Sequence, residues 1–353
     1  MKKRKIFKWV FLTTIILALA ASGAGLTYFT KNEYIPEDTQ SVAATGSKTK
    51  RVYAGDTITA VTYSVGYGIH DSSYDCVFEG GKTGKASDQA TVESNIDAVV
   101  TNIKALNPDV ILLQEVDRSS ARSYNLDEPE MIKTGLKMYN SVFAENHVCK
   151  YHPTGLSGKI NSGIQTLSKL HYLDTAERIS LPDSDKWPYE TVSMKECMLV
   201  QRVEVEDSTK QLVIINVHLT ESEMNLDQYK ELAKFMQLEF AKGNYVIAGG
   251  NFSAMLPSVR ADKYPENDDG GFYPTQLPMN VLTGGWKYCT DDSLPSARRC
   301  DKAYNGNEDN AQVYVTDGLI TSPNTLISDV KTIDTQFEAC AHNPISVKVT
   351  FVK

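Results

Sequence analysis

The 353-residue sequence has no pair of cysteines at CxxC spacing and no Cys/His spacing of the kind that binds zinc. It also has no internal repeat, no low-complexity tract and no basic excess, since its formal net charge is −8. These absences exclude a fibrous or disordered chain and non-specific binding of nucleic acid or anionic lipid through bulk charge, although local basic patches stay possible. With 41% hydrophobic and 23% charged residues, the chain can bury the core of one large domain.

Charge is also missing between Val10 and Thr30, directly after a segment, residues 2–8, that holds five Lys or Arg. An uncharged apolar run of this length suffices for a membrane helix, which needs about 20 residues. The positive-inside rule keeps the basic flank in the cytoplasm and exports the chain beyond Thr30. We therefore predict, by residue range, a cytoplasmic flank (1–9), a transmembrane signal anchor (10–30), a linker (31–50) and one domain (51–353), with the protein in the cell membrane as a single-pass protein.

A cleaved signal peptide is the alternative, because residues 18–24 supply small side chains that a signal peptidase accepts, and the domain would then be secreted. In both cases the domain works outside the cytoplasm. All six cysteines lie in this exported part, where disulfides persist. The sequence therefore predicts one to three disulfides, and proximity along the chain favours a Cys289–Cys300 pair.

Three apolar stretches of strand length each end on a polar side chain. Residues 109–117 carry Glu115, residues 212–220 carry His218, and the run from Tyr245 to Ala248 leads through Gly249-Gly250 to Asn251. Exposed polar groups at strand ends usually belong to a site. The three ends together predict a single cleft.

Strand and helix patterns alternate along the remainder of the chain, yet an apparent hairpin is also present, at residues 198–220. The expected strands are residues 56–68 (the first), 312–321, 327–334 and 345–351, and the expected helices are residues 91–106, 128–138 and 225–241. This mixture is typical of a layered α/β sandwich.

Seven short motifs occur in a fixed order, and together they resemble the endonuclease/exonuclease/phosphatase family typified by deoxyribonuclease I. The motifs are TYS, LQEVD, NSGI, NVHL, GGNFS, TDGLI and CAHNPI. The resemblance implies a four-layered α/β sandwich of two packed mixed β-sheets flanked by helices, with a divalent-metal phosphodiesterase site at one end of the sandwich.

The resemblance assigns roles to several residues of this chain. It implies that Glu115 binds the metal, that His218 stabilises the transition state or acts as an acid, and that Asp317 and His342 form the Asp/His pair. The amide of Asn161 would face the phosphate. Arg122 and Lys159 are candidate phosphate-binding residues.

Four positions depart from the family pattern: Ser64 and Ser253 each stand where the family has Asn, and Asn251 and Ala341 each stand where it has Asp. Mg²⁺ prefers anionic oxygen ligands, so Ala341 removes a ligand together with its charge. Asn251 cannot accept a proton near neutral pH, and Ser253 is shorter than Asn. We therefore expect Mg²⁺ or Mn²⁺ to bind weakly.

Each of these residues also has a purely structural interpretation. His218 can be a hydrogen-bonded, half-buried imidazole, and Asp317 with His342 can hold the last strand in place. Asn251 can cap the turn after Gly250. Arg122 and Lys159 can equally contact a phosphate or the solvent.

Two functions therefore compete. The favoured hypothesis is a degenerate family member, impaired or inactive, that keeps its cleft as a binding module at the cell surface. The alternative is an active phosphodiesterase with substitute carboxylates, for which Asp117, Asp268 and Asp269 are candidates. Nucleic acid ranks first as ligand by family analogy, ahead of a phospholipid headgroup or a small phosphoester.

Overall fold

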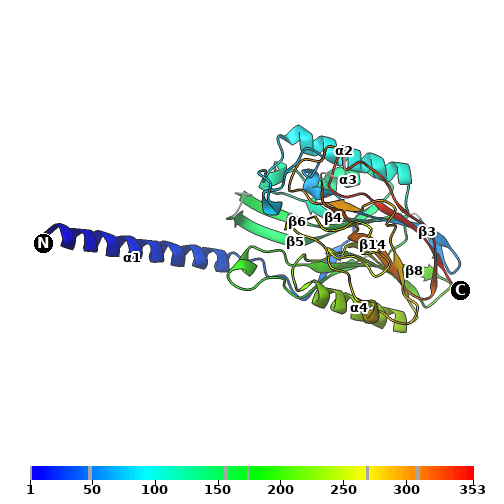
Figure 1. The fold of residues 1–353 in the computed structure, drawn as a ribbon. Coiled ribbons are helices and arrows are strands. Elements are labelled where there is room, and N and C mark those ends of the chain that lie inside the picture. The colour runs from blue at the N-terminus through cyan, green and yellow to red at the C-terminus, as the bar shows by residue number, and fades with distance from the viewer. Residues whose placement is uncertain (1, 47–49, 154–157, 173–174, 268–269, 307–310) are drawn as a thin grey trace.

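Two mixed β-sheets pack face to face and carry helices on their outer faces (Figure 1). This arrangement comes from a computed structural model, which describes residues 2–46, 50–153, 158–172, 175–267, 270–306 and 311–353. The four-layered α/β sandwich expected from the sequence is confirmed. The chain also begins with a separate apolar helix, α1 (Lys2–Lys31), which projects away from the domain.

The larger sheet has the order β1-β7-β8-β9-β10-β14-β11, with β2 paired to β8. Its strands are β1 (Thr39–Ala43), β2 (Val52–Tyr53), β7 (Thr175–Ser180), β8 (Cys197–Glu206), β9 (Gln211–His218), β10 (Tyr245–Asn251), β11 (Lys287–Cys289) and β14 (Asp317–Thr321). The smaller sheet has the order β15-β16-β3-β4-β6-β5. Its strands are β3 (Thr57–Ser64), β4 (Val110–Asp117), β5 (Asn140–His152), β6 (Gly158–Ser168), β15 (Thr325–Thr332) and β16 (Ile345–Phe351).

Shorter elements complete the domain. A two-stranded ribbon pairs β12 (Ala297–Arg298) with β13 (Val313–Tyr314). The helices are α2 (Gln89–Leu106), α3 (Glu128–Gly135) and α4 (Asn225–Ala241), and the 3₁₀ turns are η1 (Gly66–Gly68), η2 (Val77–Glu79), η3 (Ala121–Ser123), η4 (Tyr189–Thr191) and η5 (Met279–Val281).

Local sequence explains where α2 begins and ends. Asp88 precedes the helix, and its side chain accepts a hydrogen bond from the Thr91 N–H, which is the usual role of an N-cap acid. Asn107 ends the helix in the left-handed conformation (φ 47°). Between these caps, Val92, Ile96 and further apolar residues at helical spacing are buried against the smaller sheet.

The core consists of three main layers of buried side chains. One lies between the two sheets and includes Leu112, Ile214 and Ile247. A second packs α2 and α3 on the smaller sheet, and a third packs α4 on the larger sheet. Because the inner strands β9 and β10 are buried on both faces, their sequences are continuous apolar runs.

Most expected elements are present, and two of the expected strands differ from the prediction. The helix at 225–241 and the hairpin of β8 and β9 match the sequence prediction. The stretch 312–321 was expected to be one strand but divides into β13 and β14, which belong to different sheets. The strand at 56–68 is also not the first, since β1 and β2 precede it.

The segment 31–50, expected to be a linker, instead contributes β1 to the larger sheet. Residues 39–43 pair with β7, and the Ser180 N–H donates to the Asp38 carbonyl oxygen at 2.8 Å. Backbone hydrogen bonding at a sheet edge therefore holds a polar segment that shows no hydrophobic pattern. Helix α1 projects away from the domain up to its last residues, and its residues 4–31 are long and apolar enough to cross a membrane.

The predicted disulfides are absent, since all six cysteines lie in the described residues and all are buried free thiols. The pair favoured by the sequence is wrong because its members belong to different layers. Cys289 packs in the core between the sheets, whereas Cys300 packs in the cluster beneath α2. Short distance along the chain did not translate into proximity of the side chains.

Candidate active site

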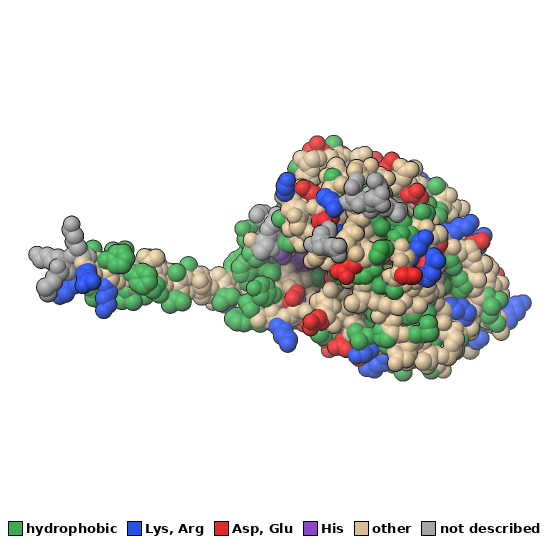
Figure 2. Space-filling view, viewed as in Figure 1, with side chains coloured by type: hydrophobic (Ala, Val, Ile, Leu, Met, Phe, Trp, Pro, Cys, Tyr) green, Lys and Arg blue, Asp and Glu red, His purple; other side chains and the backbone are tan. Residues whose placement is uncertain are grey.

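A cleft of about 380 Å³ opens at the end of the sandwich where the two sheets present their strand termini. Seven of the residues singled out from the sequence line it: Glu115, Arg122, His218, Asn251, Ser253, Ala341 and His342. Figure 2 shows histidine side chains in this hollow, close to the point where α1 joins the domain. The expectation of a single cleft at the strand ends therefore matches the geometry.

Glu115 lies at an irregularity near the end of β4. Its φ is 59°, an unusual value for a residue with a side chain, and the pairing of β4 with β6 shifts register between Leu113 and Val116. Strained backbone of this kind clusters at functional sites. The bulge turns the Glu115 carboxylate into the cleft, where 8% of the residue stays exposed.

Three imidazoles surround the Glu115 carboxylate. Its Oε1 lies 3.6 Å from His218 Nε2 and 3.9 Å from His342 Nε2, and its Oε2 lies 3.7 Å from His70 Nδ1. His218 comes from the end of β9, His342 from the turn before β16, and His70 from the loop after η1. Both sheets therefore contribute to one polar centre.

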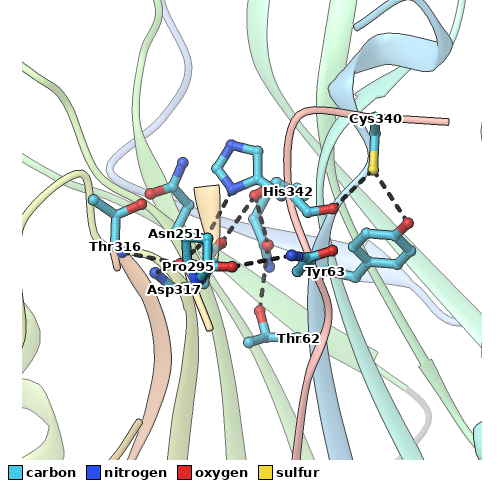
Figure 3. Close-up of polar contacts among 12 residues, drawn as sticks. Thr62, Tyr63, Asn251, Pro295, Thr316, Asp317, Cys340 and His342 are labelled. Carbon is cyan, nitrogen blue, oxygen red and sulfur yellow. Dashed lines mark hydrogen bonds and ion pairs between the residues drawn. The ribbon is translucent and has the colours of Figure 1, made fainter. Parts of the chain in front are cut away.

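Asp317 and His342 form the tightest contact of this centre (Figure 3). His342 Nδ1–H donates to Asp317 Oδ2 at 2.8 Å, and the Ser296 hydroxyl donates to the same carboxylate oxygen at 2.8 Å. Neighbouring residues fix the turn that carries His342: the Cys340 thiol lies 3.2 Å from the His342 carbonyl oxygen, and the Asn343 amide donates to the Pro295 carbonyl oxygen at 3.0 Å.

The two histidines near Glu115 Oε1, His218 and His342, differ in charge. Burial lowers the pKa of His342, but Asp317 and Glu115 outweigh this effect and raise it to about 9. Burial and the neighbouring His342 lower the pKa of His218 to about 4. At neutral pH His342 is therefore an imidazolium and His218 is neutral. Burial also raises the pKa of Glu115, with His342 opposing this shift.

The side chains at the four positions that depart from the family pattern include no carboxylate. The Asn251 side-chain oxygen accepts a hydrogen bond from the Ser253 N–H at 2.8 Å, and the Ser253 hydroxyl donates to the Leu219 carbonyl oxygen at 2.8 Å. Ser64 is fully buried, with its hydroxyl 3.2 Å from the Gln114 side-chain oxygen. Ala341 has no polar side-chain atom. Asn251 thus stabilises the turn after β10, as its structural interpretation expected.

Close strand packing explains the glycines before Asn251. A Cβ at Gly250 would lie 1.8 Å from the Val217 carbonyl oxygen, so only glycine fits there. This contact lets β10 run parallel to β9 and sets Asn251 opposite His218. Close packing therefore fixes the backbone of the strand end that carries Asn251.

The candidate phosphate ligands have protein partners. Arg122 forms a two-point ion pair with the buried Asp117, at 2.9 Å for each contact, and its guanidinium stacks 3.5 Å from the centre of the Tyr67 ring. Asn161 Nδ2 donates to Glu145 at 2.9 Å, and Lys159 Nζ lies 3.0 Å from the Ser119 hydroxyl. Neither Asn161 nor Lys159 lines the cleft. Their phosphate-contacting roles stay predictions.

Asp117 is not available as a substitute carboxylate, because it accepts hydrogen bonds from the hydroxyls of Ser120 and Ser123 besides its pairing with Arg122. Asp268 and Asp269 lie outside the described residues.

Among the cleft residues missed in the sequence are four charged or titratable ones, His70, Glu79, Glu221 and Arg298. They come from loops, from the 3₁₀ turn η2 or from the short β12, where no strand-end pattern marks them. Glu79 accepts a hydrogen bond from the Cys300 N–H at 2.7 Å, and burial raises its pKa. Glu221 stands at the rim of the cleft. Desolvation by the cleft walls and the negative charges of Glu79 and Glu115 raise its pKa to about 7. The Gly80-Gly81 turn beside Glu79 was the available signal.

Comparison with known proteins places this geometry in a family. The model of the Endonuclease/Exonuclease/phosphatase family matches residues 80–300, which is more than half of the chain. The chain belongs to this family. No curated protein matches it significantly. Members of the family generally depend on a divalent metal.

Solved structures show the same fold at low identity. An endonuclease/exonuclease/phosphatase from Beutenbergia cavernae is similar with a TM-score of 0.58 and 14% identity, over 84% of this chain and 72% of that one. The human Nocturnin catalytic domain is similar with a TM-score of 0.50 and 13% identity, over 88% of this chain and 98% of that one. At these identities, the similarities show a shared fold and nothing about the activity of this chain.

The residues around Glu115 do not fit a Mg²⁺ site of the kind that the family resemblance implies. Mg²⁺ prefers oxygen ligands, usually with one or two carboxylates. Among the described residues, the basic nitrogens within 4 Å of the Glu115 carboxylate belong to three imidazoles, and one of these, His342, is cationic at neutral pH. A cation entering here would meet a positive neighbour, and the positions that would offset it carry Asn, Ser and Ala.

Proposed function

We propose that this protein is a membrane-anchored family member, with its domain outside the cytoplasm, whose cleft binds a phosphodiester but hydrolyses it poorly. One observation carries the proposal. The side-chain oxygens at positions 251 and 253 are engaged with the protein's own backbone, and position 341 has no polar side-chain atom. Glu115 is left as the single carboxylate among the family-type metal positions.

Binding does not need the lost groups. His342 and Arg298 place two cationic side chains on the cleft wall, and charge-assisted hydrogen bonds from such donors hold phosphate oxygens. The Arg298 Nη atoms donate to backbone carbonyl oxygens, so its Nε, which has no partner among the described residues, is the donor left for a phosphate. Hydrolysis, however, requires neutralisation of the charge that develops on the phosphoryl oxygens and correct orientation of the attacking water. Losing one such group commonly costs about 10²-fold or more in rate.

Metal titration of the purified full chain in maltoside micelles tests the metal part of this proposal. We expect calorimetry to show no micromolar binding of Mg²⁺, and weak binding of Mn²⁺ at most. Hydrolysis of bis-p-nitrophenyl phosphate by the unmodified chain should be near background. Turnover that Glu115→Ala abolishes would refute the impaired-site proposal.

A separate experiment tests on which side of the membrane the domain lies. The basic flank before the uncharged run supports export of the domain. Protease added outside intact cells should then digest the domain, whereas a cytoplasmic domain would be digested only after the membrane is broken.

An active phosphodiesterase is the second candidate, favoured by Glu79 and Glu221. These side chains line the cleft and interact electrostatically with each other, and Glu221 also interacts with Glu115. They bring carboxylates into the cleft from loops outside the family motifs. If they replace the missing ligands, Glu79→Gln and Glu221→Gln should each abolish a metal-dependent activity that the unmodified chain shows.

A further inference from the structure

The end of the membrane helix is fixed to the domain by side-chain contacts. The Trp187 indole N–H donates to the Thr30 hydroxyl at 3.2 Å, and Lys150 Nζ donates to the Asn32 side-chain oxygen at 2.6 Å. Lys195, which is buried, pairs with Glu33 at 3.1 Å. Because the chain enters the sheet at β1 soon afterwards, no flexible spacer separates α1 from the domain.

These contacts fix how far the domain lies from the bilayer. The uncharged run of α1 ends at Thr30 and matches the about 20 residues that span the hydrocarbon core. A side chain that hydrogen-bonds to Thr30 therefore lies at the headgroup level. Trp187 does so, and tryptophan and tyrosine are the residues that favour this level.

We define the bilayer face as Ile35, Trp187 and Tyr189, which all lie beside the end of α1. Their exposed fractions are 77%, 55% and 73%, high values for large apolar side chains. Figure 2 shows hydrophobic side chains gathered where α1 meets the domain, next to the hollow that holds the histidines. A lipid surface would cover these side chains, and the membrane helix leads directly to them.

The same loop forms the bilayer face and a wall of the cleft. In residues 181–196, Trp187 contacts α1, while Asp185, Val192 and Met194 line the cleft. Phe78, which is 51% exposed, lines the cleft as well. Seating Trp187 at the headgroup level therefore brings the cleft mouth to the membrane surface.

The cleft also suits one phosphate better than many. Its volume of about 380 Å³ is at the lower end of small-molecule sites. Glu79, Glu196 and Glu221 line it together with Asp185, so few positions on its walls could pair with the successive phosphates of a nucleic acid. A lipid presents a single phosphodiester to His342 and Arg298.

We propose that the bilayer face rests on the membrane and that the cleft takes the phosphodiester headgroup of a lipid from the leaflet that α1 enters. This inference rests on the proposed phosphodiester binding, and it replaces the ranking of nucleic acid first. A lipid in the same membrane as the anchored domain has a high effective concentration, so weak intrinsic binding suffices.

Fluorescence quenching tests how the domain is seated. The full chain is placed in vesicles containing a lipid with a nitroxide on its headgroup, in two variants that each keep one domain tryptophan. Trp9→Phe with Trp286→Phe keeps Trp187, and Trp9→Phe with Trp187→Phe keeps the buried Trp286, which packs on Phe240. We expect strong quenching of Trp187 and little of Trp286. Equal, weak quenching of both would overturn the proposed seating.

Competition tests what the cleft takes. Glycerophosphocholine, a free headgroup diester, is titrated calorimetrically onto the full chain in maltoside micelles, which lack phosphate, and in phosphatidylcholine nanodiscs. If bilayer lipid occupies the cleft, the free diester should bind in micelles and at least about tenfold more weakly in nanodiscs. Equal binding in both would overturn the lipid inference alone. Binding in neither would overturn phosphodiester binding itself, and the lipid inference with it.

A matched pair of variants separates the bilayer face from general surface effects. Ile35→Ser with Tyr189→Ser changes two exposed residues of the bilayer face that do not line the cleft. Met138→Ser with Leu238→Ser changes two equally apolar residues, 62% and 56% exposed, elsewhere on the domain. We expect the first pair to bring glycerophosphocholine binding in nanodiscs close to its value in micelles, and the second pair to leave it weak. The same result for both pairs would contradict the proposal.

Discussion

The two sides of the cleft use their polar side chains in different ways. On one side, Asp317 and His342 keep a 2.8 Å ion pair, braced by Ser296. On the other, the strand end after Gly250 keeps its backbone geometry, but the side chains at 251 and 253 now stabilise the turn itself. A buried ion pair is costly to break because removing one member leaves an unpaired charge, whereas the side chains at 251 and 253 are uncharged.

The largest effect is expected at the ion pair. Asp317→Asn leaves the buried His342 without its counter-ion and should lower the free energy of unfolding by about 3–5 kcal/mol. The pKa of His342 should fall from about 9, because Asp317 is the main group that raises it against the effect of burial. The folded pKa is raised, so the stabilisation is full below about pH 6.5 and is lost as pH rises through about 9.

Denaturant unfolding and NMR titration of His342 measure these two changes. Asp329→Asn is the control, because Asp329 pairs with Lys348 at the exposed surface, where such pairs contribute little to stability. An unchanged pKa of His342 in Asp317→Asn would show that the ion pair does not set its charge.

The second prediction separates stability from ligand binding at the candidate phosphate residues. Arg122→Gln removes the partner of the buried Asp117 and should destabilise the fold by about 3 kcal/mol. The exposed Lys159→Gln should change stability by less than about 0.5 kcal/mol. Thermal and denaturant unfolding would measure both changes, and equal stability of the two variants would contradict the structural role of Arg122.

The third prediction concerns the end of β10, the strand that carries Asn251. Gly250→Ala would push a Cβ against the Val217 carbonyl oxygen and should destabilise by at least about 1–3 kcal/mol. Gly243→Ala is the control, because no atom lies within 4 Å of its Cβ and only its positive φ of 88° opposes alanine, at about 1 kcal/mol. Equal effects on unfolding would mean that the packing of β10 on β9 is looser than the contact implies.

The smallest effect is expected from a single reversion on the damaged side. Ala341→Asp adds one carboxylate while positions 251 and 253 stay unchanged. Groups that act as a unit do not contribute independently, so hydrolysis of bis-p-nitrophenyl phosphate should change by less than about tenfold. A large gain from this variant alone would show that position 341 is the sole defect.

Sequence reasoning succeeded where apolar periodicity and turn residues determine structure. The bounds of α4 and the strand ends carrying Glu115, His218 and Asn251 follow directly from such patterns. It failed where structure depends on contacts between distant segments. Edge pairing recruits β1, and tertiary packing separates Cys289 from Cys300. The cleft residues His70 and Glu79 come from loops whose paths no local pattern specifies.

The central claim is that the cleft lost its metal side while keeping the scaffold and the ion pair. Combined reversion of Asn251→Asp, Ser253→Asn and Ala341→Asp tests it most directly, with hydrolysis of bis-p-nitrophenyl phosphate and Mg²⁺ or Mn²⁺ binding measured beside the unmodified chain. We predict metal-dependent hydrolysis about 10²-fold or more above the unmodified chain. A triple variant that binds metal and stays inert would contradict the claim, because it would mean that the cleft has been rebuilt for something other than phosphoryl chemistry.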